Sequence, residues 1–218
     1  LMKFIIVLGA PGAGKSTTLV KYIESSADKF SSTFFTRYNV EPELADIVAK
    51  QTVEVWINET CTTALLGKYK PDKDKKYELV GADLYTQPQR TRLKAIIQQL
   101  KIMGIKTIIT DGFACINKPF LDQLKITAET ICCIELSTPE KICQKRFKER
   151  NVKMWKRLNE ESRAKKYQTM TFGPWKESRA YRKTKLVLDL IKQTEGDHLE
   201  AKDADDAAEI LFRESNSK

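Results

Sequence analysis

The sequence predicts an α/β fold in which a doubly wound, mainly parallel sheet forms the middle layer of a three-layer sandwich. Apolar, β-branched runs such as 3–8 and 106–110 alternate with segments of helical periodicity. These runs are apolar on both faces, which is typical of parallel strands buried between helices. A glycine-rich loop at 9–16 directly follows the first run, and the length of 218 residues suits one domain of this class.

The first half of the chain begins with a strand, the glycine loop and a helix. The run at 3–8 (KFIIVL) indicates a buried strand, and Leu19, Val20 and Ile23 lie on one side of the helix expected at 17–25. Further elements are then expected as strands at 33–37, 53–57 and 62–68, the last two forming a hairpin, and as a helix at 42–50.

The second half contains a long amphipathic helix at 88–103, in which apolar residues recur at spacings of three and four before Gly104 ends it. Ser137 or Thr138 is expected to cap a helix at 139–150. The other predicted elements are strands at 106–110, 130–136 and 198–201, and helices at 119–124, 152–168, 176–191 and 203–214.

Two regions, 53–80 and 151–180, interrupt the alternation of strands and helices. We interpret residues 1–218 as a single domain with an acceptor-binding insertion at about 53–87. The region at about 151–180 is expected to form a basic, helical lid.

Residues 9–16 read GxxxxGKS, the phosphate-binding loop known as Walker A, and a chance glycine turn is the alternative. Its backbone N–H groups and the start of the following helix are suited to cradle a triphosphate. Lys15 is expected to reach the β- and γ-phosphates, and the Ser16 hydroxyl to ligate Mg²⁺. The predicted nucleotide-binding residues are Gly9, Gly12, Ala13, Gly14, Lys15, Ser16 and Thr17.

Two aspartates are candidates for the chemistry. Asp111 ends an apolar strand and is followed by Gly112, which is the position where a carboxylate holds Mg²⁺ in such proteins; a simple Asp-Gly turn is the alternative. Asp83 lies in the segment 81–90 and is placed to accept a proton from a substrate hydroxyl, beside Tyr85, which could stack on a base. A solvated Asp83 in a helix-capping loop is equally compatible, and either aspartate remains open as the general base.

Positive charge is concentrated late in the chain. The net charge is +9, yet residues 139–185 alone contain 16 Lys and Arg against 5 Glu, an excess of 11. Such a segment favours a polyanion as partner, although a charge run is commonly only a solvated face. We expect Arg150 to stabilise the transferring phosphoryl group. The basic set and the aromatic residues interleaved with it, which suit base stacking or plain helix packing, are Arg146, Arg150, Lys153, Lys156, Arg157 and Arg163, with Trp155, Tyr167, Phe172, Trp175 and Tyr181.

The remaining composition bounds the class of protein. Five cysteines without CxxC spacing are expected to be reduced thiols in a cytoplasmic protein, in the host cytoplasm if the chain is viral. The single His198 is interpreted as structural or solvated. No run approaches the roughly 18 apolar residues of a membrane span, so we expect no membrane partner.

Three pieces of the sequence together resemble the P-loop kinases of the nucleoside monophosphate kinase group. They are GAPGAGKST at 9–17, ITDGF at 109–113 and IELSTPEKICQKRFKER at 134–150. In adenylate kinases the second piece continues with Pro-Arg, whereas here it continues Ala114-Cys115, which departs from an adenylate acceptor site. The resemblance implies ATP and Mg²⁺ as cofactors and an arginine-bearing helix that leads to a lid.

A narrower pattern resembles small bacteriophage kinases, including those that phosphorylate 5-hydroxymethyluracil in DNA. It consists of LGKY at 66–69, GAD at 81–83, QP at 87–88 and a basic stretch at 162–167. This resemblance implies DNA modification, with transfer of the ATP γ-phosphate to a hydroxyl of a DNA base.

Other acceptors and one other class of protein remain open. The phosphate could go to a free nucleoside or nucleoside monophosphate, with the basic helices serving as an ordinary lid. Alternatively, a nucleic-acid-binding ATPase would hydrolyse ATP to water. The excess charge of residues 139–185 favours DNA, because a mononucleotide requires only a few cationic contacts.

Overall fold

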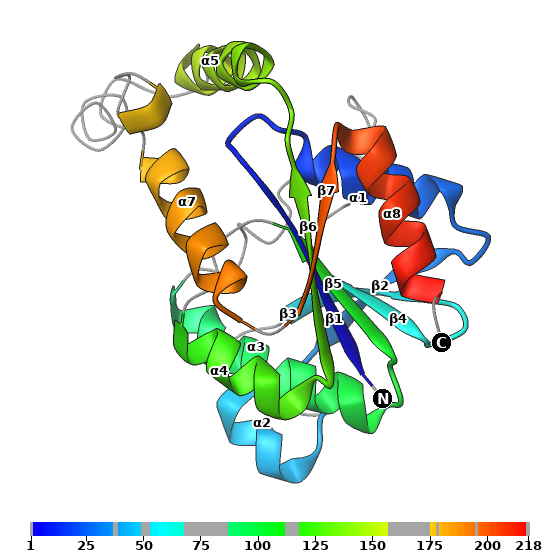
Figure 1. Cartoon of the computed structure of the whole chain (residues 1–218). Helices are drawn as coiled ribbons and strands as arrows, with labels where there is room; N and C mark the ends of the chain where they lie inside the picture. The colour runs from blue at the N-terminus through cyan, green and yellow to red at the C-terminus, as the bar shows by residue number, and fades with distance from the viewer. Residues whose placement is uncertain are drawn as a thin grey trace.

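A computed structural model describes residues 2–36, 39–48, 53–67, 87–111, 118–156, 175–177, 179–194 and 196–216. Its centre is a seven-stranded sheet with the order β2-β3-β4-β5-β1-β6-β7 (Figure 1). Strands β4, β5, β1, β6 and β7 are parallel, and β3 is antiparallel to both of its neighbours. The strands are β1 (Lys3–Gly9), β2 (Phe30–Phe35), β3 (Val53–Asn58), β4 (Thr63–Leu66), β5 (Thr107–Asp111), β6 (Thr130–Leu136) and β7 (Asp197–Ala201).

Helices cover both faces of this sheet, which confirms the predicted three-layer α/β architecture. In Figure 1, α3, α4 and α7 lie on one side of the strands, α1 and α8 lie on the other, and α5 lies beyond the end at which β6 finishes. The helices are α1 (Lys15–Ser25), α2 (Pro42–Val48), α3 (Gln87–Ile102), α4 (Lys118–Thr127), α5 (Glu140–Lys156), α7 (Arg179–Lys192) and α8 (Ala204–Asn216), with a 3₁₀ turn, η2 (Trp175–Glu177), before α7. None of the described helices combines the length and the apolar character needed to cross a membrane.

Strand β1 is apolar at every position from 4 to 8, and its packing shows why. Phe4 and Ile6 pack into the core shared with α3, α4 and α7, whereas Ile5 and Val7 pack into the core shared with α1 and α8. Consecutive side chains along a strand point to opposite faces of the sheet, so a strand that helices cover on both faces needs an unbroken apolar run.

The position of β1 in the sheet determines where the glycine loop lies. Val7 pairs with Asp111 of β5 on one side and with Ile134 of β6 on the other. The loop that follows β1 therefore emerges between the carboxyl ends of two parallel strands, the edge at which open α/β sheets bind their ligands.

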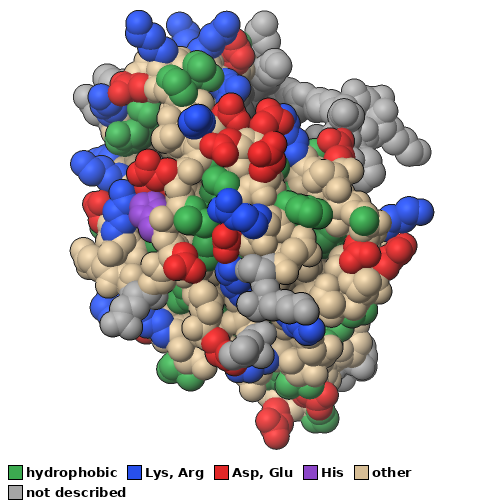
Figure 2. All heavy atoms as spheres, turned by 45° about the vertical axis from the view of Figure 1, so that its right-hand side comes forward, with side chains coloured by type: hydrophobic (Ala, Val, Ile, Leu, Met, Phe, Trp, Pro, Cys, Tyr) green, Lys and Arg blue, Asp and Glu red, His purple; other side chains and the backbone are tan. Residues whose placement is uncertain are grey.

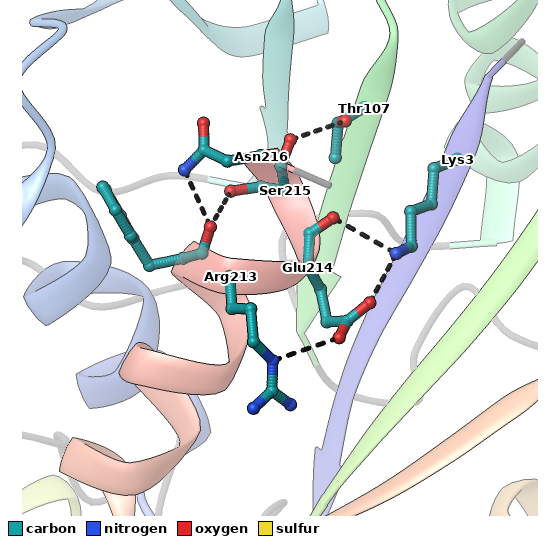
Figure 3. A network of polar contacts seen from close by, with 7 residues as sticks. Lys3, Thr107, Arg213, Glu214, Ser215 and Asn216 are labelled. Carbon is teal, nitrogen blue, oxygen red and sulfur yellow. Dashed lines mark hydrogen bonds and ion pairs between the residues drawn. The ribbon is translucent and has the colours of Figure 1, made fainter. Parts of the chain in front are cut away.

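At the amino ends of the strands, the last turn of α8 is hydrogen-bonded to the first residues of β1 and β5 (Figure 3). Lys3 Nζ donates to Glu214 Oε2 at 2.6 Å and to the Glu214 carbonyl at 3.2 Å, and Thr107 Oγ1 donates to the Ser215 carbonyl at 3.5 Å. The hydrogen bond from Lys3 is the main reason why the pKa of Glu214 lies below its usual value. These contacts fix the C-terminal end of α8 against the sheet.

Several predicted boundaries differ from the structure; helix α4, for example, continues to Thr127, beyond the predicted end at 124. Strand β2 begins at Phe30, before the predicted start at 33, because Phe30, Ser31 and Ser32 pair with β3. Helix α5 continues to Lys156, so the predicted break after 150 is wrong, and the segment 151–156 contains no Gly or Pro to end it. Helix α7 begins at Arg179 after the separate turn η2.

Candidate nucleotide-binding site

The glycine loop connects β1 to α1, and part of its backbone is held by its own neighbours. Lys15 Nζ donates to the carbonyls of Gly9 at 2.9 Å and Ala10 at 3.2 Å. Ala13 N–H donates to the Ala10 carbonyl at 3.0 Å, and Thr18 donates to the Gly14 carbonyl through both its N–H and its hydroxyl. The lysine ammonium thus lies against the loop that it is predicted to serve.

Side chains from distant parts of the chain hold the other three carbonyls of the loop. Trp175 Nε1 donates to the Pro11 carbonyl at 3.1 Å. Arg146 Nη1 donates to the Gly12 carbonyl at 3.4 Å, and Thr138 Oγ1 donates to the Ala13 carbonyl at 2.9 Å. We call Thr138, Arg146 and Trp175 the carbonyl clamp.

The carbonyl clamp has a consequence for the N–H groups of the loop. The C=O and N–H groups of a trans peptide point in opposite directions, so holding one fixes the other. The bonds to Pro11 and Ala13 therefore fix the orientation of the Gly12 and Gly14 N–H groups. Oriented N–H groups are what a loop of this kind offers to phosphate oxygens.

Gly12 is required by both its conformation and its surroundings. Its φ is +90°, a left-handed value that favours glycine. A Cβ at this position would lie 2.4 Å from the Cys143 carbonyl oxygen, so the backbone of α5 packs directly on the loop.

Ser16 and Asp111, the predicted metal ligands, lie together. Ser16 Oγ, in the first turn of α1, donates to Asp111 Oδ2 at 2.7 Å, and Asp111 is only 3% exposed at the end of β5. Hydroxyl and carboxylate oxygens are ligands that suit Mg²⁺, which usually completes its shell with phosphate and water oxygens. The described residues contain no cluster of three His, Cys, Asp or Glu side chains that could hold a metal ion without such help.

Cys143 lies beside the loop but is not suited to act as a nucleophile. The thiol is buried, and this burial raises its pKa, an effect that the charges of Lys15 and Arg146 offset only in part. The protonated thiol donates to the Thr138 carbonyl at 3.4 Å. Cys143 therefore contributes packing beneath the carbonyl clamp.

Other sequence predictions fare differently. Asp83, Tyr85 and the segment 157–174 lie outside the described residues, and Arg150 follows Arg146 by one turn of α5, although its side chain is not described. Two of the aromatic residues considered for base stacking, Trp175 and Tyr181, instead contact each other with ring centroids 4.5 Å apart. This arrangement corresponds to the alternative of ordinary packing.

The clamp itself was not predicted. Thr138 was expected to cap a helix, but its hydroxyl donates to the loop, while Ser137 Oγ donates to the Ala201 carbonyl at 3.0 Å. The available signal was topological: a parallel strand ending beside β1 brings the residues after it to the loop. The cysteine prediction is confirmed for Cys61, Cys132, Cys133 and Cys143, which are free thiols.

Comparisons with known proteins add little to this description. The sequence matches no protein-family model and no curated protein. Among solved structures, a sugar kinase from Janibacter sp. HTCC2649 has a TM-score of 0.38 and 9% identity, with 99% of this chain and 92% of that chain covered. A gluconokinase from Sinorhizobium meliloti 1021 has a TM-score of 0.39 and 14% identity, with 98% and 89% covered.

At these values the likeness carries no argument about activity. The sheet order, the helices on both faces and the strand–loop–helix unit at 3–25 define the class: a P-loop α/β fold.

Proposed function

We propose that the protein is a kinase that transfers the γ-phosphate of ATP to a small acceptor, with Mg²⁺ as cofactor. One observation carries this proposal: the Ser16 hydroxyl donates to the Asp111 carboxylate at 2.7 Å, beside the glycine loop. In that loop the Lys15 ammonium donates to the Gly9 carbonyl. A hydroxyl, a buried carboxylate and an ammonium group at a helix start are the parts that phosphoryl transfer requires.

Each residue has a distinct role in this proposal. Ser16 and Asp111 would hold Mg²⁺, which neutralises phosphate charge when bound. Lys15 would contact the β- and γ-phosphates, and Arg146 or Arg150 would stabilise charge on the group in transfer. Because Asp111 is assigned to Mg²⁺ in this proposal, Asp83 is the candidate for the general base.

For the acceptor, we favour a free nucleoside or nucleotide. Cations near the loop are engaged locally, since Arg146 donates to the Gly12 carbonyl and Lys176 Nζ pairs with Glu140 Oε2 at 3.0 Å. On the face drawn in Figure 2, acidic side chains are interspersed among the basic ones. A hydroxyl on DNA is the second candidate, and the excess of 11 positive charges in residues 139–185 favours it.

The experiment follows the label of γ-³²P-ATP with Mg²⁺ in the presence of nucleosides, nucleoside monophosphates and DNA that contains 5-hydroxymethyluracil. Transfer to a free nucleoside or nucleotide is the expected result, and Lys15→Ala should abolish it because the phosphate contact is lost. Label found only as inorganic phosphate with every acceptor would support the ATPase instead. Unchanged transfer by the Lys15→Ala variant would overturn the whole assignment.

Salt dependence separates the two acceptor classes. Activity on DNA should fall steeply between low and high salt, because phosphate contacts release counterions. Replacing Lys156, Arg157, Lys165 and Lys166 with Gln should flatten that dependence while ATP affinity is kept. Activity on a free nucleotide should be nearly insensitive to salt and to these replacements.

A further inference from the structure

We propose that Trp175 is a positioning residue that holds the phosphate loop in its binding conformation. This inference rests on the proposed function only in that a triphosphate is the ligand. Trp175 contacts neither phosphate nor acceptor in this proposal; it acts through the Pro11 carbonyl, to which its indole N–H donates at 3.1 Å.

The indole is itself held firmly in place. Trp175 is 9% exposed and belongs to the apolar cluster that contains Ala13 and Cys143. Its ring contacts Tyr181 of α7 with centroids 4.5 Å apart, and the next residue, Lys176, pairs with Glu140 of α5. The donor is therefore fixed from two helices, and a buried indole N–H needs an acceptor.

The carbonyl that accepts this bond belongs to a peptide that needs such a restraint. Gly12 follows Pro11, and glycine populates positive and negative φ about equally well, so steric repulsion does not select the observed φ of +90°. A hydrogen bond to the Pro11 carbonyl selects one orientation of this peptide and directs the Gly12 N–H. Without the bond, part of the population has this N–H turned away from a phosphate, and apparent affinity falls by that fraction.

The coupling is reciprocal. If the indole bond favours the binding conformation, then phosphate bound to the loop favours the indole bond by the same factor. A triphosphate should therefore change the environment of Trp175 although it does not touch the ring, which gives a readout independent of catalysis.

The test compares Trp175→Phe with a matched control, Trp56→Phe. Both tryptophans are buried, and both donate through Nε1, but Trp56 lies in β3 and donates to Glu54 Oε1 at 3.3 Å, away from the loop. Phenylalanine keeps an aromatic ring and removes the donor. Calorimetry measures the affinity for Mg-ATP and for inorganic tripolyphosphate, and thermal unfolding is recorded for each protein.

We expect Trp175→Phe to bind both ligands about fivefold more weakly, the effect of one net hydrogen bond on the loop equilibrium. Trp56→Phe should bind within about twofold of the wild type by the same measure. In steady-state kinetics Trp175→Phe should raise KM for ATP and leave kcat nearly unchanged. Wild-type affinity in Trp175→Phe, or an equal loss in the two variants, overturns the inference and leaves the proposed function intact.

A second measurement does not depend on how well Trp175→Phe folds. In a protein with Trp56→Phe and Trp155→Phe, Trp175 is the only tryptophan. Excited at a wavelength that tyrosine does not absorb, it reports alone, and tripolyphosphate should shift its emission. Emission that does not change on saturation with tripolyphosphate overturns the inference. Failure of the wild-type protein to bind either ligand overturns the proposed function and this inference together.

Discussion

Replacing Gly12 with Ala tests whether α5 and the phosphate loop are as tightly packed as the structure shows. The new Cβ would lie 2.4 Å from the Cys143 carbonyl oxygen, whereas ordinary contact begins at 3.4 Å. The loop or α5 must therefore move by about 1 Å, and overpacking of this kind costs about 1–3 kcal/mol. The left-handed φ of +90° adds about 1 kcal/mol for a residue with a Cβ.

The expected loss is thus about 3 kcal/mol in the free energy of unfolding. For a chain of this size that lowers Tm by about 6–12 °C. Affinity for Mg-ATP should fall as well, because the displaced peptide is the one that presents the Gly12 N–H.

Gly104→Ala provides the matched control. Its φ of +84° resembles that of Gly12, but a Cβ there would meet nothing within 4 Å. This variant should lose only about 1 kcal/mol, the conformational part of the penalty. Thermal unfolding followed by circular dichroism, with calorimetric titration of Mg-ATP, compares the two. Equal Tm values for the two variants, with wild-type ATP affinity in Gly12→Ala, would refute the reasoning.

Three other predictions follow from single contacts. Ser16→Ala should raise the Mg²⁺ concentration needed for half-maximal phosphoryl transfer and lower Tm by about 2–6 °C, because the buried Asp111 carboxylate loses a hydrogen bond that contributes about 1–1.5 kcal/mol; an unchanged Mg²⁺ dependence would argue against the metal site. Thr110→Val should raise the free energy of unfolding by about 1 kcal/mol, because the buried Thr110 hydroxyl has no hydrogen-bond partner among the described residues; a lower Tm would show that the hydroxyl is satisfied. Lys3 lowers the pKa of Glu214, so the ionised Glu214 carboxylate stabilises the folded protein. This stabilisation is complete above the usual pKa of 4.5 and is lost as pH falls through the lowered value. Glu214→Gln should therefore unfold more easily at pH 7 and show a shallower loss of stability below pH 4.5, measured by urea titration.

Local sequence was sufficient to predict those strands and helices whose pattern of apolar residues reflects their own burial. The run 130–136 is apolar enough to indicate a buried strand, and β6 has these bounds. The hairpin of β3 and β4 was also expected, and the two strands pair antiparallel. That β3 also pairs with β2, and β4 with β5, depends on contacts between distant segments, which a local pattern does not contain.

The residues of the candidate site also divide into those that local sequence predicts and those that it does not. Lys15 and Ser16 belong to a motif whose spacing reflects a local backbone turn, so they were predictable. Thr138 and Trp175 reach the loop from segments more than 100 residues away, and their residue types suit caps and packing equally well. Only the three-dimensional arrangement reveals that the loop shares its carbonyls with them.

The place of β1 in the sheet has a consequence for biosynthesis. Strand β1 lies between β5 and β6, which are both synthesised after it, so Ile5 must wait for Ile109 and Cys132 as partners. At a synthesis rate of roughly 5–20 residues per second, that wait lasts about 5–25 s. During this time the apolar run of β1 is exposed to other nascent chains. A chaperone that binds short apolar stretches would find one target at 3–8. The phosphate loop is held by all of its contacts only when Trp175 has been translated, so the segment 3–25 alone lacks one of the hydrogen bonds that orient the loop.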